Sequence, residues 1–145
     1  MGDQSFTQPN LLSAVLSTLL SMAEAAARNA HAPYSRFFVG AALLLESGDM
    51  VAGANVENAS YRLTTCAEQS AIAHAVCTFG PGIRIRAMLI QNLNAAPCQP
   101  CGACRQAIAE FAPPEALILF PAADGKLTQK TLAELLPGAF YLGHT

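Results

Sequence analysis

Three cysteines and one glutamate have the residue types and spacing of a hydrolytic metal centre. Cys66 and Glu68 stand in one segment, and Cys101 and Cys104 stand in a second. A catalytic zinc ion is typically held by three protein ligands, so that water takes the fourth position. Glu68 follows Cys66 by two positions, so its carboxylate could reach that water without binding the metal. The pattern therefore indicates a zinc site in which Glu68 acts as general acid and base.

A purely structural interpretation of Glu68 stays open at this point. Thr65 and Glu68 match the S/T-x-x-E pattern of a capping box, in which the glutamate bonds back to the N–H of the first residue. Taken alone, the pattern favours neither interpretation over the other.

A closed zinc site is the second alternative. Cys98 and Cys101 form a C-x-x-C pair, so four thiolates could surround the metal and leave no position for water. Cys77 stands in the same helical pattern as Cys66 and is expected to be a small buried residue. The number of zinc ligands therefore separates a catalytic site from a structural one.

The segments that carry the cysteines are predicted to be helix starts. Cys66 and Cys101 each stand where a loop is expected to become a helix, and Cys104 lies one turn beyond Cys101. Pro100 suits the residue that precedes the first helical turn. A helix N-terminus carries unpaired N–H groups and partial positive charge, which favour the thiolate that a metal requires. Two helix ends that converge could thus supply all three ligands.

Hydrophobic periodicity and turn residues predict the remaining elements. Helices are expected over residues 9–29, 65–79, 102–111 and 131–136, and strands over 38–46, 50–56, 83–91 and 116–120. Strands that alternate with helices favour parallel crossovers, and the hairpin at Ser47-Gly48-Asp49 makes the sheet mixed. The expected fold is a three-layer α/β/α sandwich, with residues 1–145 forming a single domain.

Composition narrows the classes of partner. The chain has 145 residues, of which 52% are hydrophobic and 12% charged, with a formal net charge of −2. This balance argues against nucleic acid as a partner, because proteins that bind polyanions usually carry a basic face. No apolar stretch is long enough to predict a membrane span, and the N-terminus lacks the pattern of a secretory signal. Five cysteines, clustered and odd in number, favour metal binding in a reducing cytoplasm over a disulfide framework.

Five motifs in order resemble the cytidine deaminases of the small homotetrameric type, over nearly the whole chain. They are Pro33-Tyr34-Ser35-Arg36-Phe37, Val39-Gly40-Ala41-Ala42-Leu43, Asn55-Val56-Glu57-Asn58-Ala59-Ser60-Tyr61, Cys66-Ala67-Glu68 and Pro100-Cys101-Gly102-Ala103-Cys104-Arg105-Gln106. The resemblance implies zinc-dependent deamination of cytidine and 2′-deoxycytidine to uridine and 2′-deoxyuridine, with release of ammonia, as in pyrimidine salvage. It also implies a homotetramer that acts on a small nucleoside.

The resemblance assigns roles to individual residues. It implies one zinc per chain on Cys66, Cys101 and Cys104, with Glu68 moving protons. It implies ribose contacts from Asn55 and Glu57, a base contact from the Phe37 ring and a hydrogen bond from the Ala67 N–H to the base carbonyl. Phe140 matches a C-terminal aromatic residue that reaches the site of a neighbouring subunit. Asn55 and Glu57 would point to opposite faces of a continuous strand, so joint contact with the ribose requires the strand to end after Ala54.

Gln69 departs from the family pattern. Many relatives with three cysteine ligands carry arginine directly after the catalytic glutamate, where it bonds a thiolate and offsets its charge. Three thiolates around Zn²⁺ leave a net charge of −1, and Gln69 can donate a hydrogen bond but no charge. Arg62 and Arg105 are the candidate cations that would compensate.

Two other functions remain to be weighed against nucleoside deamination. One is deamination of a base in RNA or DNA, or of a nucleoside-like antibiotic; the acidic balance disfavours the nucleic-acid version. The other is a non-enzymatic interaction module built on a four-cysteine zinc site.

Overall fold

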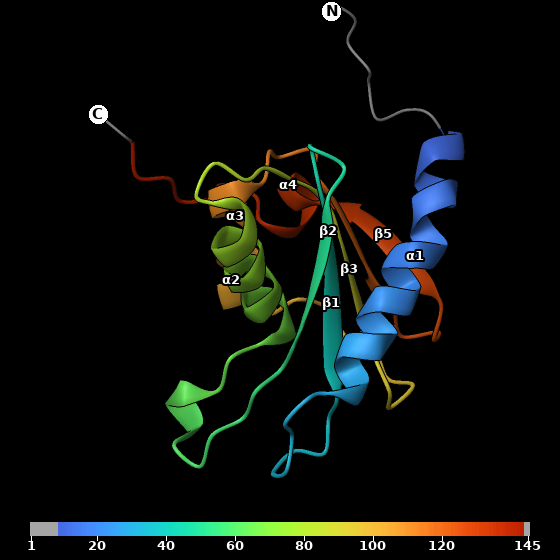
Figure 1. Cartoon of the computed structure of the whole chain (residues 1–145), viewed down its shortest axis with the longest axis vertical. Coiled ribbons are helices and arrows are strands. Elements are labelled where there is room, and N and C mark those ends of the chain that lie inside the picture. The colour runs from blue at the N-terminus through green and yellow to red at the C-terminus, as the bar shows by residue number, and fades with distance from the viewer. Residues whose placement is uncertain (1–8, 144–145) are drawn as a thin grey trace, which may run out of the picture.

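The computed structural model describes residues 9–143, and Figure 1 shows how its elements are arranged. The helices are α1 (Pro9–Arg28), α2 (Ala67–Phe79), α3 (Gly102–Phe111) and α4 (Leu132–Leu135), with one 3₁₀ turn, η1 (Tyr61–Leu63). The strands are β1 (Val39–Leu45), β2 (Met50–Ala54), β3 (Ile85–Asn92), β4 (Leu117–Pro121) and β5 (Leu127–Thr131).

The strands form one mixed sheet in the order β2-β1-β3-β4-β5. β3 and β4 pair in parallel, and the other three neighbouring pairs are antiparallel. Since β2 and β3 are each antiparallel to β1, they run in the same direction. The loops that leave their carboxyl ends therefore lie at the same edge of the sheet, and these loops lead into α2 and α3. Ligand sites in α/β proteins commonly lie at this edge.

Helices cover both faces of the sheet, as predicted for a three-layer α/β/α sandwich (Figure 1). Alternate residues of β1 point to opposite layers: Ala42 and Leu44 pack with α1, whereas Ala41 and Leu43 pack in the core that includes α2 and α3. Every residue of β1 is buried, which is typical of a strand covered on both faces. No helix in the described residues is long and apolar enough to cross a membrane.

Two glycines allow the helices to approach the sheet closely. A Cβ on Gly40 of β1 would overlap the backbone of α1 at Ala23 and Ala27. A Cβ on Gly53 of β2 would overlap the backbone of α2 at Ser70 and Ala71. At these two positions the helix backbone rests directly on the strand backbone.

Two elements of the predicted secondary structure, and the expected burial of Cys77, need correction. The strand β5 was not expected, because its residues Leu127–Thr131 are mostly exposed and polar, which is common for an edge strand. Cys77 is exposed, not buried. The expected helix over 131–136 is shorter, with Thr131 as its N-cap.

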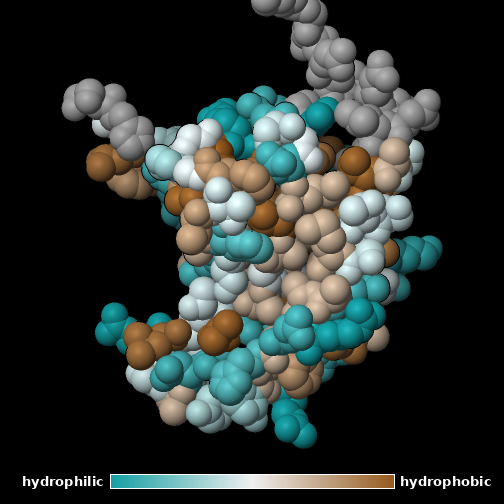
Figure 2. All heavy atoms as spheres, viewed as in Figure 1, coloured by the Kyte–Doolittle hydropathy of each residue, from teal (hydrophilic) through white to brown (hydrophobic). Residues whose placement is uncertain are grey.

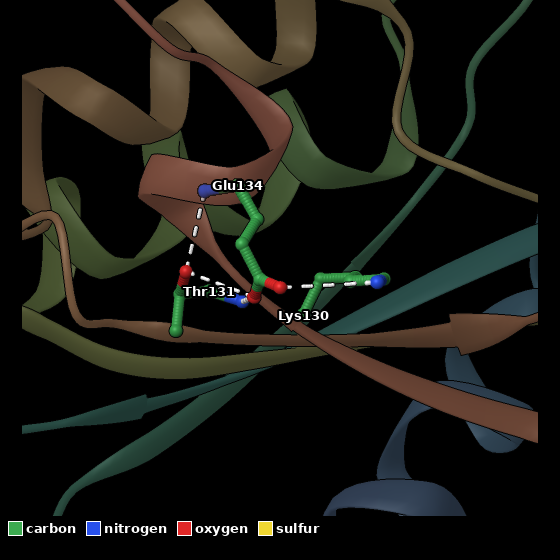
Figure 3. Close-up of polar contacts among 3 residues, drawn as sticks. All are labelled: Lys130, Thr131 and Glu134. Atoms are coloured by element: carbon green, nitrogen blue, oxygen red, sulfur yellow. Dashed lines mark hydrogen bonds and ion pairs between the residues drawn. The ribbon is translucent and has the colours of Figure 1, made fainter.

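A capping box stands at the start of α4. The Thr131 hydroxyl accepts a hydrogen bond from the Glu134 N–H at 3.2 Å, and the Glu134 carboxylate accepts one from the Thr131 N–H at 2.7 Å (Figure 3). The same carboxylate lies 3.8 Å from the ammonium group of Lys130. These contacts fix the direct change from β5 into α4.

Candidate metal centre and active site

Three cysteine thiols converge at the edge of the sheet where α2 and α3 begin. Cys66 is the N-cap of α2, and Cys101 is the N-cap of α3. Cys104 lies one turn into α3 and is fully buried. The three sulfur atoms all lie within 4.8 Å of one another. The predicted convergence of two helix ends is therefore confirmed, and the group is positioned to bind a metal ion.

Hydrogen bonds to sulfur shape the electrostatics of this group. The Cys104 N–H donates to Cys101 Sγ at 3.4 Å, as expected at a helix N-terminus. A hydrogen bond from the Cys104 thiol lowers the pKa of Cys66 to about 7, despite the opposing effects of burial and of Glu68. That bond, together with burial, raises the pKa of Cys104. Three clustered thiolates that line a pocket suit zinc and leave one coordination position open to a small molecule.

Cys98 lies outside the cluster formed by Cys66, Cys101 and Cys104. Among the residues that the structure describes, the side chains placed to share a metal are Cys66, Cys101 and Cys104. Burial raises the pKa of Cys98 to about 11, which disfavours the thiolate that a metal needs. The geometry thus favours three protein ligands over four, and an open site over a closed one.

Glu68 stands on α2 with its side chain buried, and only 5% of the residue is exposed. This burial raises the pKa of its carboxyl group. The capping-box interpretation of Glu68 is wrong, because the helix begins one residue later than that pattern requires. Cys66, not Thr65, is the N-cap, and the Thr65 N–H donates to the carbonyl of Val56 at 2.9 Å.

A pocket of about 200 Å³ lies over the cluster of three cysteine thiols. Its wall includes the buried Glu68 and three of the residues expected to contact substrate. The lining residues are Phe37, Val39, Asn55, Thr64, Cys66, Ala67, Glu68, Cys98, Gln99, Cys101 and Cys104. The pocket thus brings together a metal-binding group, a buried carboxyl and an aromatic wall.

Asn55 lies in this pocket wall and also supports the backbone beside it. The strand β2 ends at Ala54, as the shared ribose contact required. The Asn55 carboxamide accepts a hydrogen bond from the Val39 N–H at 2.9 Å and donates one to the Phe37 carbonyl at 2.8 Å. One N–H of its amide group therefore stays available for a ligand.

Glu57 and Phe140 are the two predicted substrate residues that do not line the pocket of this chain. The Glu57 carboxylate accepts hydrogen bonds from the N–H groups of Tyr34 at 3.0 Å and Ser35 at 3.1 Å. A hydrogen bond from the Ser35 side chain is the main cause that lowers the pKa of Glu57. Phe140 is 68% exposed, and its carbonyl accepts a hydrogen bond from Gln106 at 2.8 Å.

Comparison with known proteins agrees with this geometry. The family model described as the cytidine and deoxycytidylate deaminase zinc-binding region matches residues 14–120. The chain belongs to this family. It is 44% identical to the cytidine deaminase of Halalkalibacterium halodurans over 123 residues, which cover 84% of this chain and 91% of the relative. It is 42% identical to that of Sporosarcina psychrophila over 123 residues, which cover 84% and 88%.

Solved structures of the family share the fold. The crystal structure of cytidine deaminase from Mycobacterium tuberculosis superimposes with a TM-score of 0.77 at 40% identity. The match covers 88% of this chain and 98% of that one. The expected cytidine deaminase-like sandwich is confirmed, and the zinc-binding family match agrees with the thiol group found at the edge of the sheet.

Gln69 contacts the cluster of three cysteine thiols through an uncharged side chain. Its amide nitrogen donates to Cys104 Sγ at 3.5 Å. The three guanidinium nitrogens of Arg105 instead bond to oxygen atoms, namely the carbonyls of Pro100 and Leu135 at 2.8 Å and the Gln99 side chain at 3.2 Å. The contact with sulfur therefore comes from an amide, while Arg105 holds the backbone that leads to Cys101.

Gln69→Leu should weaken zinc binding, because the donor to Cys104 Sγ is lost. Loss of a supporting contact to a metal ligand typically lowers metal affinity about 10- to 100-fold. Competition with a chromophoric chelator measures that affinity. Gln69→Arg is the matched control: it restores a donor with charge and should bind zinc at least as tightly as the parent chain. Equal zinc affinity in the Leu variant would contradict a role for Gln69 at the metal.

Thr64 and Gln99 also line the pocket but were not predicted from the sequence. Thr64 follows the 3₁₀ turn η1, for which the sequence carries no local signal. Gln99 lies between Cys98 and Pro100, and the proximity of two cysteines was the signal that could have identified it.

Proposed function

We propose that this protein catalyses the hydrolytic deamination of cytidine and 2′-deoxycytidine. Water replaces the C4 amino group of the base, so that the products are uridine or 2′-deoxyuridine and ammonia. The observation that carries the proposal is one pocket that contains three sulfur atoms within 4.8 Å and the buried carboxyl of Glu68. Residues 1–145 are proposed to act as one domain.

The roles of the metal ligands and of Glu68 follow from their positions. Cys66, Cys101 and Cys104 would hold one zinc ion, which supplies an activated water when bound. Glu68 would accept one proton from the water and pass it to N3 of the ring. It would then take the second proton from the hydroxyl group that has added to C4 and deliver it to the amino group, which leaves as ammonia while the C4 carbonyl forms. Burial suits this exchange, because a carboxyl with a raised pKa is a stronger base towards a nearby proton.

Contacts with the nucleoside are proposed for five further residues. The Phe37 ring would pack against the base, and the Ala67 N–H would bond its carbonyl, since the first N–H groups of a helix have no partner within it. Asn55 would bond the ribose through its remaining N–H, and Glu57 through its carboxylate. Phe140 would complete the site of another subunit.

An ultraviolet assay on the zinc-loaded protein tests the proposal. The panel should contain cytidine, 2′-deoxycytidine, adenosine, a cytosine-containing single-stranded oligonucleotide and a cytosine-based nucleoside antibiotic. We expect turnover of the first two. Turnover confined to the oligonucleotide or to the antibiotic would assign a different substrate class, and zinc-loaded protein that converts nothing would indicate a structural zinc module.

The proposed assembly is a homotetramer, supported by hydrophobic residues that monomeric proteins usually cover. Figure 2 shows hydrophobic atoms on the projecting loop between β2 and α2 and on the C-terminal segment. The large exposed hydrophobic residues there are Val56, Tyr61, Leu63, Phe140, Tyr141 and Leu142. All five cysteines are free thiols, which supports a reducing, cytoplasmic location.

Sedimentation should give a mass of about four chains, and Phe140→Ala should raise the KM for cytidine about tenfold or more. The Phe140 ring would be buried against substrate in a neighbouring subunit, and its removal would take away that apolar contact. Leu142→Ala is the matched control, since Leu142 is also exposed but has no proposed substrate contact. A fully active monomer would contradict the proposed assembly.

A further inference from the structure

Asn94 joins two segments that both contribute to the pocket. It stands in the loop after β3, and its side chain bonds the backbone of the segment that precedes β1. Its oxygen accepts from the Phe38 N–H at 3.0 Å, and its nitrogen donates to the Arg36 carbonyl at 2.9 Å. The neighbouring Leu93 N–H donates to the Phe38 carbonyl at 3.0 Å. The Asn94 side chain thus holds both backbone neighbours of Phe37.

The remaining backbone groups at Phe37 are also held by side chains. Asn55 bonds the Phe37 carbonyl and the Val39 N–H, and the Ser35 hydroxyl accepts from the Phe37 N–H at 3.0 Å. Arg36 has φ of 59°, a left-handed conformation that a residue with a side chain adopts at an energetic cost. The surroundings therefore impose the backbone conformation before Phe37. Asn94 bonds the backbone of Arg36 and Phe38, and Asn55 bonds the backbone of Phe37 and Val39.

The same loop leads from Asn94 to the metal group. Cys98 lies further along it and lines the pocket, and its N–H is fixed to the Pro121 carbonyl at 2.9 Å. Cys101 follows at the start of α3. Asn94 consequently ties the segment that carries the aromatic wall to the loop that carries a zinc ligand.

We infer that Asn94 is a positioning residue for substrate binding, which acts by fixing Phe37 relative to the metal group. The inference rests on the proposed function. Asn94 is exposed and is not among the residues that line the pocket, so it acts through the backbone of Arg36 and Phe38. Because Phe37 would contact the base both before and during the reaction, its displacement weakens substrate binding more than turnover.

Asn94→Ala should raise the KM for cytidine about tenfold while kcat stays within about twofold, since two hydrogen bonds that set the Phe37 backbone are lost. The Kd for uridine, measured by calorimetry on the zinc-loaded protein, should rise by a similar factor. Asn94→Asp keeps the acceptor for the Phe38 N–H but loses the donor to Arg36, so its KM should lie between those of the parent and Asn94→Ala. Zinc content should equal that of the parent in both variants.

Asp124→Ala is the control for a general loss of stability. Asp124 also bonds a backbone N–H, that of Lys126 at 3.0 Å, in the turn between β4 and β5. The Asp124→Ala variant should have the same KM for cytidine and the same Kd for uridine as the parent. A lower unfolding temperature in Asn94→Ala with parental KM and Kd would overturn the inference, as would a loss of zinc that accounts for the change. If the parent converts no nucleoside, the proposed function fails; if the parent converts cytidine and Asn94→Ala matches it, the inference alone fails.

Discussion

Serine in place of Cys66, Cys101 or Cys104 should release zinc and lower deamination by more than about 100-fold, because a neutral hydroxyl is a far poorer ligand than a thiolate. The three sulfur atoms lie within 4.8 Å of one another, so each substitution leaves only two thiol ligands. Cys98→Ser should instead retain about one zinc per chain and most of the activity. Cys98 is the matched control, since it lines the same pocket but stands outside the group.

Metal analysis and the cytidine assay on these four variants decide the ligand set. Release of zinc by Cys98→Ser together with retention by Cys104→Ser would show that the ligands have been assigned wrongly. Release by all four variants would indicate a closed site with no position for water, and the proposed reaction would lose its nucleophile.

Glu68→Gln should keep the fold and the zinc but lower turnover about 10²- to 10⁴-fold, the usual contribution of a general acid and base. Glutamine has nearly the same shape, but its amide cannot accept and return a proton. The side chain is buried in the pocket wall, so no bulk water replaces the carboxyl at this position.

The zinc content and the unfolding temperature of Glu68→Gln must be measured beside kcat. Glu134→Gln is a matched control, because Glu134 is the glutamate of the capping box at α4 and should affect only stability. Turnover by Glu68→Gln close to that of the parent would exclude a proton-transfer role for Glu68.

The metal site was predictable because its signals are local. The sequence predicts the start of each helix to within a few residues. Pro100 marks the start of α3, and the polar residues around Cys66 mark the start of α2. Spacing along one helical turn then placed Cys104 beside Cys101. The choice between Cys98 and Cys104 depended on where α3 begins, and the structure places that start at Gly102.

Other features depended on contacts between residues far apart in the chain. Asn94 and Phe38 are 56 positions apart, so no local pattern indicates their hydrogen bond. The strand β5 has little apolar alternation, and its pairing with β4 decides its conformation. Glu57 was expected near the ribose from its motif alone, whereas its bonds to Tyr34 and Ser35 required the folded chain.

The close approach of Gly53 to α2 has a consequence for the metal. Ser70 and Ala71, which lie over Gly53, belong to the same helix start as Cys66 and Glu68. The distance between the start of α2 and the sheet is thus set by backbone contact with β2, a strand that contributes no metal ligand. A Cβ at position 53 would overlap the backbone of α2, so α2 and β2 would have to separate. We expect this separation to move Cys66 relative to Cys101 and Cys104, which stand at the start of α3. Because position 53 has no side chain, α2 can lie close enough to the sheet for Cys66 to meet the two cysteines of α3.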